Sequence, residues 1–145
     1  MREITSAEVQ GLKECLESLA EHHNEVSTDF GGSYPSRPYE ETLELFEQAL
    51  TSGTSRIAVA EDRGCIIGFC KIDICAENGK LDYLVVKKAY RGKGCGKLLM
   101  DWAMQTFESC NVRHIEVKVV AGNDAIHLYE KYGFKVNAHI LALNR

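Results

Sequence analysis

The chain has 145 residues, a mass of 16.2 kDa and hydrophobic and charged contents of 45% and 26%, which describe a globular protein large enough to bury its own core. Its net charge of −4 argues against non-specific nucleic-acid binding, which requires a basic surface, and mildly favours a cationic substrate. The chain has no run of about 18 apolar residues, so no membrane span is expected. The first residues lack the apolar core of a secretion signal.

The six cysteines predict reduced thiols rather than disulfides or a metal site. They form no Cys-x-x-Cys pair and fall mostly in apolar strand and helix patterns, as is usual for a cytoplasmic protein. The adjacent His22 and His23 have no carboxylate or further histidine at ligand spacing. We therefore expect a cytoplasmic protein that binds no metal.

The first third of the chain predicts a short strand near residues 1–5 and then two helices. Ser6 is placed to cap the first helix, whose apolar face includes Leu12. The second helix is expected at about residues 39–51. Between the helices, residues 21–39 form a polar loop that contains several aromatic side chains.

Antiparallel strands are expected next. The sheet should begin at Ile57, turn at residues 62–64 and return over residues 66–75. Residues 77–80, Glu-Asn-Gly-Lys, are typical of a two-residue hairpin turn. The strand that follows, residues 81–86, is apolar on both faces, which predicts a buried central strand.

The most informative segment follows that strand and reads Arg91-Gly-Lys-Gly-Cys-Gly-Lys97. It opens a helix whose apolar residues recur on one face through Cys110. A helix start leaves about four N–H groups unpaired and is the positive end of the helix dipole. The glycines let a phosphate approach those amides, and Arg91, Lys93 and Lys97 add positive charge. The segment therefore predicts a pyrophosphate-binding site.

Two other nucleotide-binding motifs fail at specific residues. A dinucleotide fingerprint would need a glycine where Lys97 stands. An ATP-type P-loop would need Ser or Thr after Lys97, but Leu98 stands there, so no hydroxyl is available for a magnesium ion. For the segment taken alone, an ordinary turn before a helix stays as the alternative.

A second motif lies further along the chain. Residues 115–119 alternate as a strand, and a short helix is expected from Asn123 to Tyr132, with Gly133 placed to end it. Phe134 should then begin a last strand that reaches about Leu143.

In this order, joined by one helix and one strand, the two motifs resemble the GCN5-related N-acetyltransferase (GNAT) family, which binds acetyl-CoA. The resemblance covers residues 55–135 well and the N-terminal helices more loosely. It implies an α/β fold in which a mixed, strongly curved sheet of about six strands is flanked by four helices. It also implies that residues 1–145 form a single N-acetyltransferase domain. The sequence departs from the family at its C-terminus, where only one strand fits after Phe134 and many relatives have two.

The resemblance assigns residues to acetyl-CoA as the co-substrate. The backbone of Leu84, Val85 and Val86 would bind the acetyl carbonyl and the pantetheine arm, and Asn123 would contact the same arm. Asn123 stands six residues before Tyr129, one fewer than is usual in the family. The pyrophosphate would lie on the glycine-rich segment, which consists of Arg91, Gly92, Lys93, Gly94, Cys95, Gly96 and Lys97.

Direct acetyl transfer to an amine poses two proton problems. The ammonium must lose a proton before its nitrogen can attack, and the leaving thiolate departs more easily beside an O–H donor. By resemblance Tyr129 is that donor; the alternative is a core phenol bonded to backbone. Glu116 and Asp82, acting through water, are the candidates for the base; alternatively, both are solvated or structural charges.

We therefore expect acetyl transfer from acetyl-CoA to a primary amine of a small molecule or peptide. An alternative from another class is a non-catalytic acetyl-CoA-binding sensor or assembly subunit. A third reading is a thiol-based redox protein that uses Cys95, or Cys70 with Cys75. The identity of the amine stays open.

The loop at residues 21–39 and the C-terminus bear on the partners. By resemblance the loop lines the acceptor pocket, where its side chains would bind or desolvate an amine; the alternative is a solvated loop with a few anchoring aromatics. A shortened C-terminus leaves an open sheet edge, which predicts a homodimer formed by edge pairing. The loop side chains in question are His22, His23, Glu25, Tyr34 and Tyr39.

Overall fold

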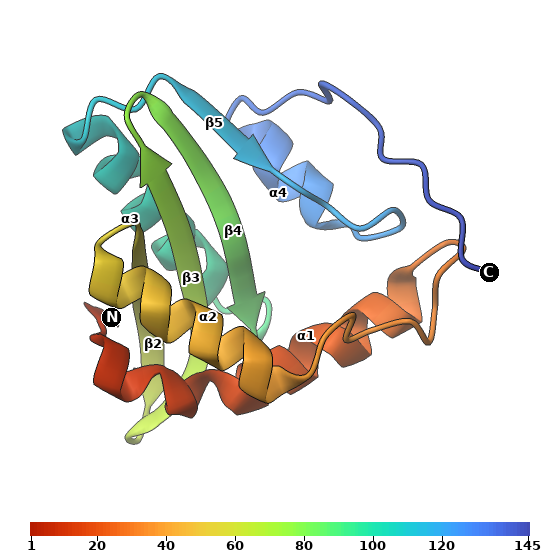
Figure 1. Cartoon of the computed structure of the whole chain (residues 1–145), viewed down its shortest axis with the longest axis horizontal. Helices are drawn as coiled ribbons and strands as arrows, with labels where there is room; N and C mark the ends of the chain where they lie inside the picture. The colour runs from red at the N-terminus through yellow and green to blue at the C-terminus, as the bar shows by residue number, and fades with distance from the viewer.

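The computed structural model describes residues 1–145 and shows a five-stranded mixed sheet between two pairs of helices (Figure 1). The strands lie in the order β1-β2-β3-β4-β5, and neighbours run antiparallel except β4 and β5, which are parallel. This confirms the predicted α/β fold, with five strands where about six were expected. The elements are β1 (Arg2–Glu3), the 3-10 helix η1 (Ser6–Leu12), α1 (Lys13–Val26), α2 (Tyr39–Ser52), β2 (Ser55–Asp62), β3 (Cys65–Cys75), β4 (Asn78–Val86), the 3-10 helix η2 (Lys88–Tyr90), α3 (Cys95–Ser109), β5 (His114–Val117) and α4 (Ala125–Lys131).

The sheet separates two hydrophobic cores. Helices α1 and α2 cover one face, where the rings of Phe46, Phe69 and Tyr83 pack at centroid distances of 5.0 to 6.1 Å. Helices α3 and α4 cover the other face, where Leu99 and Phe107 are buried. Because both faces are covered, the central strand is apolar on both sides, as its sequence predicts.

The first helix is capped by Thr5 rather than by the predicted Ser6. The Glu8 carboxylate accepts a hydrogen bond from the Thr5 N–H at 3.2 Å, as in a capping box. The first turns form the 3-10 helix η1, and α1 continues from Lys13. None of the helices combines the length and the apolar composition that a membrane crossing requires.

The hairpin between β3 and β4 turns two residues earlier than predicted. Ala76 and Glu77 make the turn, because Asn78 already pairs with the end of β3, and Ala76 takes a left-handed φ of 54°. Gly79 belongs to the strand. A side chain there would meet the Phe107 ring at 2.6 Å, so this glycine allows α3 to pack closely on the sheet.

A bulge redirects β4 at Asp82. Ile72 pairs with Leu81 but Lys71 pairs with Tyr83, so Asp82 is an extra residue in β4. Leu81 therefore points into the α3–α4 core and Tyr83 into the α1–α2 core, although they are two positions apart. Bulges bend and twist a strand locally, and β4 parts from β5 at this residue.

Strands β4 and β5 pair only over four residues each. The parallel ladder joins residues 78–81 to residues 114–117 and ends there. Figure 1 shows the two strands diverging beyond it. Residues 82–86 of β4 thus have β3 on one side and no strand on the other. We call the space between the diverging strands the β4–β5 opening.

The last strand that the sequence predicts, from Phe134 to Leu143, does not form. Residues 134–145 have no regular secondary structure, and Figure 1 shows them leaving the sheet and ending near the loop after α1. Phe134 packs on Tyr129, but Leu141 is 94% exposed. Alternating apolar residues favour a strand only where one face is buried, and this segment buries neither face.

Candidate active site

The last residues of β4 present backbone groups to the β4–β5 opening, where no strand pairs with them. The Lys87 N–H donates to the Ile67 carbonyl at 2.8 Å across the β3 side. Hydrogen-bonding residues alternate in an antiparallel pair, so Val85 also faces β3. Leu84 and Val86 direct their N–H and C=O groups to the opposite side, which is the opening. The structure therefore offers two of the three predicted backbone positions to a ligand there.

The glycine-rich segment follows β4 and starts α3. Gly92 and Gly94 have left-handed φ values of 76° and 86°, and nothing lies within 4 Å of the position a side chain would take. Gly94 is the N-cap of α3, a helix of 15 residues. The first amides of α3 are therefore accessible to an anion, and the helix dipole favours one there.

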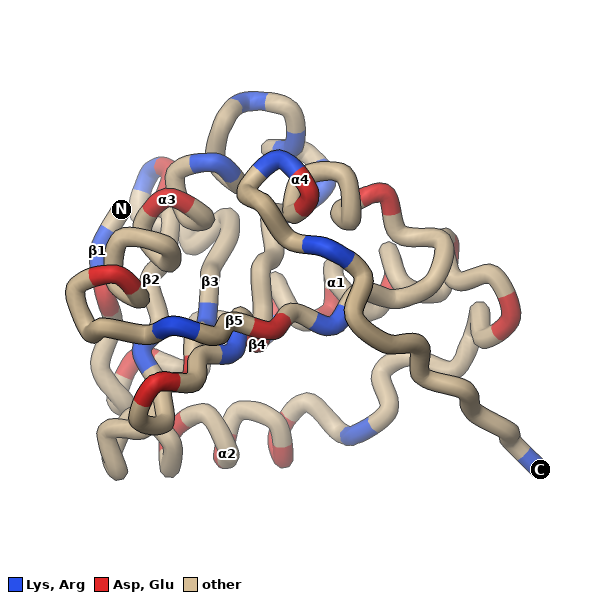
Figure 2. The backbone as a smooth tube through the Cα atoms, turned by 90° about the horizontal axis from the view of Figure 1, so that it is seen from above, with Lys and Arg blue, Asp and Glu red and all other residues tan.

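Positive side chains surround this helix start, and each contacts a protein group. Arg91 donates from Nε to the Val86 carbonyl at 2.9 Å. Lys97 pairs with Asp101 one turn further along at 2.7 Å, and the Lys93 ammonium lies 5.8 Å from the centre of a neighbouring tyrosine ring. In Figure 2, basic positions gather beside α3 and α4, whereas acidic positions follow α2.

His22, near the end of α1, links the glycine-rich segment to α4. Its Nδ1 lies 3.3 Å from Nη1 of Arg91, and its Nε2 lies 3.3 Å from Oδ1 of Asn123. Arginine can only donate, so Nδ1 accepts and Nε2 carries the proton donated to Asn123. The Asn123 Oδ1 also accepts the Ala125 N–H at 3.0 Å, which fixes the start of α4. His22 thus contacts two residues predicted to bind acetyl-CoA.

Tyr129 lies on the inner side of α4 and is 7% exposed. Burial raises the pKa of its phenol to about 12, with a smaller contribution from the Cys70 thiol. The hydroxyl makes no hydrogen bond within the protein, so the alternative of a phenol bonded to backbone does not hold. Every fully buried side-chain nitrogen or oxygen in the structure has a hydrogen-bond partner. The Tyr129 hydroxyl has none, so it is not fully buried and reaches accessible space.

All six cysteines are free thiols. Cys95 lies in the first turn of α3, where the helix dipole favours a thiolate, but burial raises its pKa. Burial also raises the pKa of Cys70, to about 12. Raised pKa values leave these two thiols protonated at neutral pH and weak as nucleophiles. No group of three or more His, Cys, Asp or Glu side chains is arranged to hold a metal ion.

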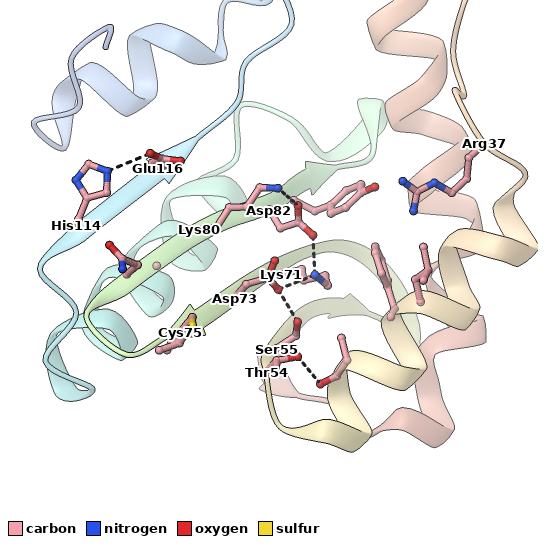
Figure 3. Close-up of a pocket in the computed structure, with 17 residues that line it drawn as sticks. Arg37, Thr54, Ser55, Lys71, Asp73, Cys75, Lys80, Asp82, His114 and Glu116 are labelled. Carbon is pink, nitrogen blue, oxygen red and sulfur yellow. Dashed lines mark hydrogen bonds and ion pairs between the residues drawn. The ribbon is translucent and has the colours of Figure 1, made fainter. Parts of the chain in front are cut away.

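A cavity of about 710 Å³ lies on the α2 side of the sheet, beside the bulge (Figure 3). Its floor holds Lys71, whose side chain is 6% exposed and whose ammonium bonds to Asp73 at 2.7 Å and Asp82 at 2.6 Å. Ser55 donates to Asp73 at 2.5 Å, and the Phe46 ring centre lies 5.2 Å from the ammonium. Two carboxylates on one ammonium leave this triad with a net negative charge.

Four further side chains complete the charged lining. Glu116 and His114 of β5 contact each other at 3.1 Å, and Lys80 of β4 lies 3.4 Å from Asp82. Arg37 reaches the cavity from the segment just before α2. Figure 3 shows Arg37 on one side of the cavity and Glu116 with His114 on the opposite side.

Comparison with known proteins fixes the family. A model of the acetyltransferase (GNAT) family matches residues 19–134. The chain belongs to the GNAT family. A Bacillus subtilis (strain 168) protein, described provisionally as a ribosomal protein bS18-alanine N-acetyltransferase, is 25% identical over 92 residues, which are 63% of this chain and 61% of that protein. The match therefore spans about three fifths of the length of that relative.

Solved structures of other proteins share the fold. The BH1408 protein of Bacillus halodurans, as a tetramutant, has a TM-score of 0.79 and 20% identity, covering 99% of this chain and 98% of that one. The PaiA N-acetyltransferase of Thermoplasma acidophilum, in complex with coenzyme A, has a TM-score of 0.77 and 21% identity, covering 94% and 89%. At these identities the likeness establishes a common fold.

Within this GNAT fold, the sequence predictions fall into two groups. The positions assigned to acetyl-CoA cluster around the β4–β5 opening and the start of α3. The loop predicted at residues 21–39 is shorter, because residues 21–26 belong to α1 and Tyr39 begins α2. The positions assigned to the acceptor do not line the cavity: the rings of His23 and Tyr34 pack at a centroid distance of 5.1 Å, and Tyr39 packs against the α1–α2 core. Arg37 is the one residue between α1 and α2 in the lining. Sequence reasoning missed Lys71, although a lysine inside an apolar strand was the available signal.

Proposed function

We propose that this GNAT protein transfers the acetyl group of acetyl-CoA directly to a primary amine. The observation that carries the proposal is the bulge at Asp82, because it joins two sites. On one side lies the β4–β5 opening with the backbone groups of Leu84 and Val86. On the other side lies the charged cavity. A thioester in the opening would meet an amine that enters from the cavity.

The residues around the opening fit acetyl-CoA. The first amides of α3 suit a pyrophosphate, and the side-chain-free positions at Gly92 and Gly94 leave room for it. Arg91, Lys93 and Lys97 supply positive charge. The Leu84 N–H and C=O and the Val86 N–H, which no strand pairs with, suit the amides of a pantetheine arm, whereas the Val86 carbonyl accepts from Arg91. The Thermoplasma relative, which has the same fold, was solved in complex with coenzyme A, which supports a coenzyme A thioester as the ligand.

The chemistry requires one proton to leave the acceptor and one to reach the sulfur. The acceptor ammonium loses a proton, its nitrogen attacks the thioester carbonyl carbon, the N–C bond forms and the C–S bond breaks. The sulfur leaves as a thiolate and takes up a proton. No oxidant or reductant is needed, so the protein must only position the two reactants and handle these protons.

Asp82 suits proton acceptance better than Glu116. Its side chain is 20% exposed, is oriented by Lys71 and lies two residues from Leu84. Glu116 is 67% exposed and contacts only His114. We assign to Asp82 the role of accepting the ammonium proton, directly or through one water molecule.

Tyr129 acts as a hydrogen-bond donor to the departing thiolate. Its pKa of about 12 keeps the phenol protonated at neutral pH. A free thiol has a pKa of about 8.5, so complete proton transfer from the phenol would cost about 5 kcal/mol. Hydrogen bonding lowers the energy of the thiolate without this transfer, and the proton that finally binds sulfur comes from solvent.

Mass spectrometry of the reaction products tests the proposal. Wild type and Tyr129→Phe are incubated with acetyl-CoA and a panel of amino acids, dipeptides, polyamines, a lysine peptide and a peptide with N-terminal alanine, the last because of the Bacillus subtilis relative. Acetylated product from wild type, with far less from Tyr129→Phe, supports the transferase. Absence of product across the panel, with acetyl-CoA bound in calorimetry, favours an acetyl-CoA-binding sensor instead.

A further inference from the structure

We infer that the acceptor carries a carboxylate in addition to its amine, and that Arg37 binds this carboxylate. The inference rests on the proposed acetyl transfer and narrows its acceptor to amino acids and short peptides with a free carboxylate. The acceptor amine would lie near Asp82, beside the opening, and its carboxylate would lie at the other side of the cavity (Figure 3).

The cavity is balanced in charge, which disfavours a polycation. A polyamine or an aminoglycoside brings several positive charges and needs an excess of unpaired carboxylates. A molecule with one amine and one carboxylate matches a lining with no net charge. The charged lining residues are Asp73, Asp82 and Glu116 against Lys71, Lys80 and Arg37.

Arg37 differs from the other two cations in its pairing. Lys71 lies between Asp73 and Asp82, and Lys80 lies 3.4 Å from Asp82. No carboxylate of the protein lies within 4.0 Å of the Arg37 guanidinium, although acidic residues make up much of the adjacent α2. A guanidinium binds a carboxylate through two parallel hydrogen bonds, so an unpaired one facing a cavity is a ready partner for an acidic ligand.

The Tyr83 ring connects the two ends of this site. Tyr83 follows Asp82 in β4 and lines the same cavity. Burial raises the pKa of its phenol and the charge of Asp82 adds to this, whereas the charge of Arg37 opposes it. The guanidinium is therefore within electrostatic reach of the phenol. An acceptor that extends from Asp82 to Arg37 would run along this ring.

Two acceptors that differ only in the carboxylate test the inference. Alanylglycine and alanylglycinamide, with spermidine as a third acceptor, are compared by kcat/KM on wild type, Arg37→Gln and Arg63→Gln. Arg63 is a matched control, since it is an exposed arginine in the β2–β3 turn and does not line the cavity. Calorimetry with acetyl-CoA confirms that each variant retains a folded binding site.

Wild type should favour the acid over its amide by about tenfold to a hundredfold, as a charge-assisted hydrogen bond provides. This ratio should fall to about one in Arg37→Gln through KM, persist in Arg63→Gln, and shrink at about 0.5 M salt. Equal rates for acid and amide in wild type, or preference for spermidine, would overturn the inference and leave acetyl transfer standing. No product from any acceptor, with acetyl-CoA bound, would overturn both.

Discussion

The two halves of β4 show how one strand provides both packing and an open binding edge. Residues 78–81 pair with β3 and β5, and Gly79 lets Phe107 pack directly on the backbone. Residues 83–86 pair with β3 alone. One inserted residue, Asp82, separates the halves. A ligand site thus arises where the sheet leaves its own hydrogen bonding incomplete, because unpaired N–H and C=O groups are strong donors and acceptors.

Lys71 lies where the two halves meet, and its replacement should have the largest effect. Lys71→Met leaves Asp73 and Asp82 together without their cation. Because both carboxylates keep some exposure, we expect a loss at the low end for a broken buried pair, about 3 kcal/mol in the free energy of unfolding, measured by urea denaturation.

Lys80→Met is the matched control for that loss. Lys80 contacts the same Asp82 but is 54% exposed, so its replacement should change the free energy of unfolding by less than about 0.5 kcal/mol. Equal effects of the two substitutions would show that the triad does not stabilise the junction between the halves.

Tyr129→Phe should lower kcat by about a hundredfold and leave KM for acetyl-CoA unchanged, because the hydroxyl acts on the departing thiolate alone. The free energy of unfolding should stay unchanged, since no hydrogen bond within the protein is lost. With a pKa of about 12 the phenol does not titrate below about pH 10, so wild type and variant should share the alkaline limb of the rate profile.

Tyr132→Phe provides the comparison. Its hydroxyl donates to Asp101 at 2.5 Å, away from the opening, so kcat should stay within about twofold of wild type. A fall in kcat for Tyr132→Phe as large as that for Tyr129→Phe would assign both residues to support of α4 rather than to the reaction.

Asp82→Asn and Asp73→Asn separate proximity to the opening from contact with Lys71. Each substitution weakens one of two similar bonds to the same ammonium, at 2.6 and 2.7 Å. Only Asp82 is the bulge residue. We expect kcat to be about tenfold lower in Asp82→Asn than in Asp73→Asn, with similar urea midpoints. Equal kcat values would remove Asp82 from proton acceptance.

His22 should give the smallest effect, on binding alone. His22→Ala removes the link between Arg91 and Asn123 and should raise KM for acetyl-CoA about fivefold with kcat unchanged, as the loss of roughly one net hydrogen bond predicts. Glutamine can accept from one partner and donate to the other, so His22→Gln should stay within twofold of wild type. A glutamine variant as weak as the alanine variant would argue against this positioning role.

The local motifs were predictable from sequence because their physics is local. Glycines before an apolar helix specify an accessible helix start, and residues 81–86, which are apolar on both faces, specify a central strand of the sheet. The order of these motifs gave the fold. The predicted turn at Asn78-Gly79 was wrong, because Gly79 belongs to the strand and allows Phe107 of α3, distant in sequence, to pack against it.

The rest of the site depends on contacts between distant segments. The pairing of Lys71 with Asp82 follows from the register of β3 on β4 and from the bulge between them, which no local pattern encodes. His22 contacts residues about 70 and 100 positions away, so the sequence alone could not show that it faces Arg91 and Asn123. The predicted strand from Phe134 to Leu143 was wrong, because alternating apolar residues do not by themselves provide a neighbouring strand to pair with.

Backbone amide shifts on addition of acetyl-CoA to the nitrogen-15-labelled protein test the central claim most directly. The amides of Leu84 and Val86 and those at the start of α3 should shift strongly, whereas those of residues 78–81 should move little, because β5 already pairs with them. Shifts confined to residues 78–81 or to the cavity, with Leu84 and Val86 unchanged, would contradict the assignment of the β4–β5 opening to acetyl-CoA.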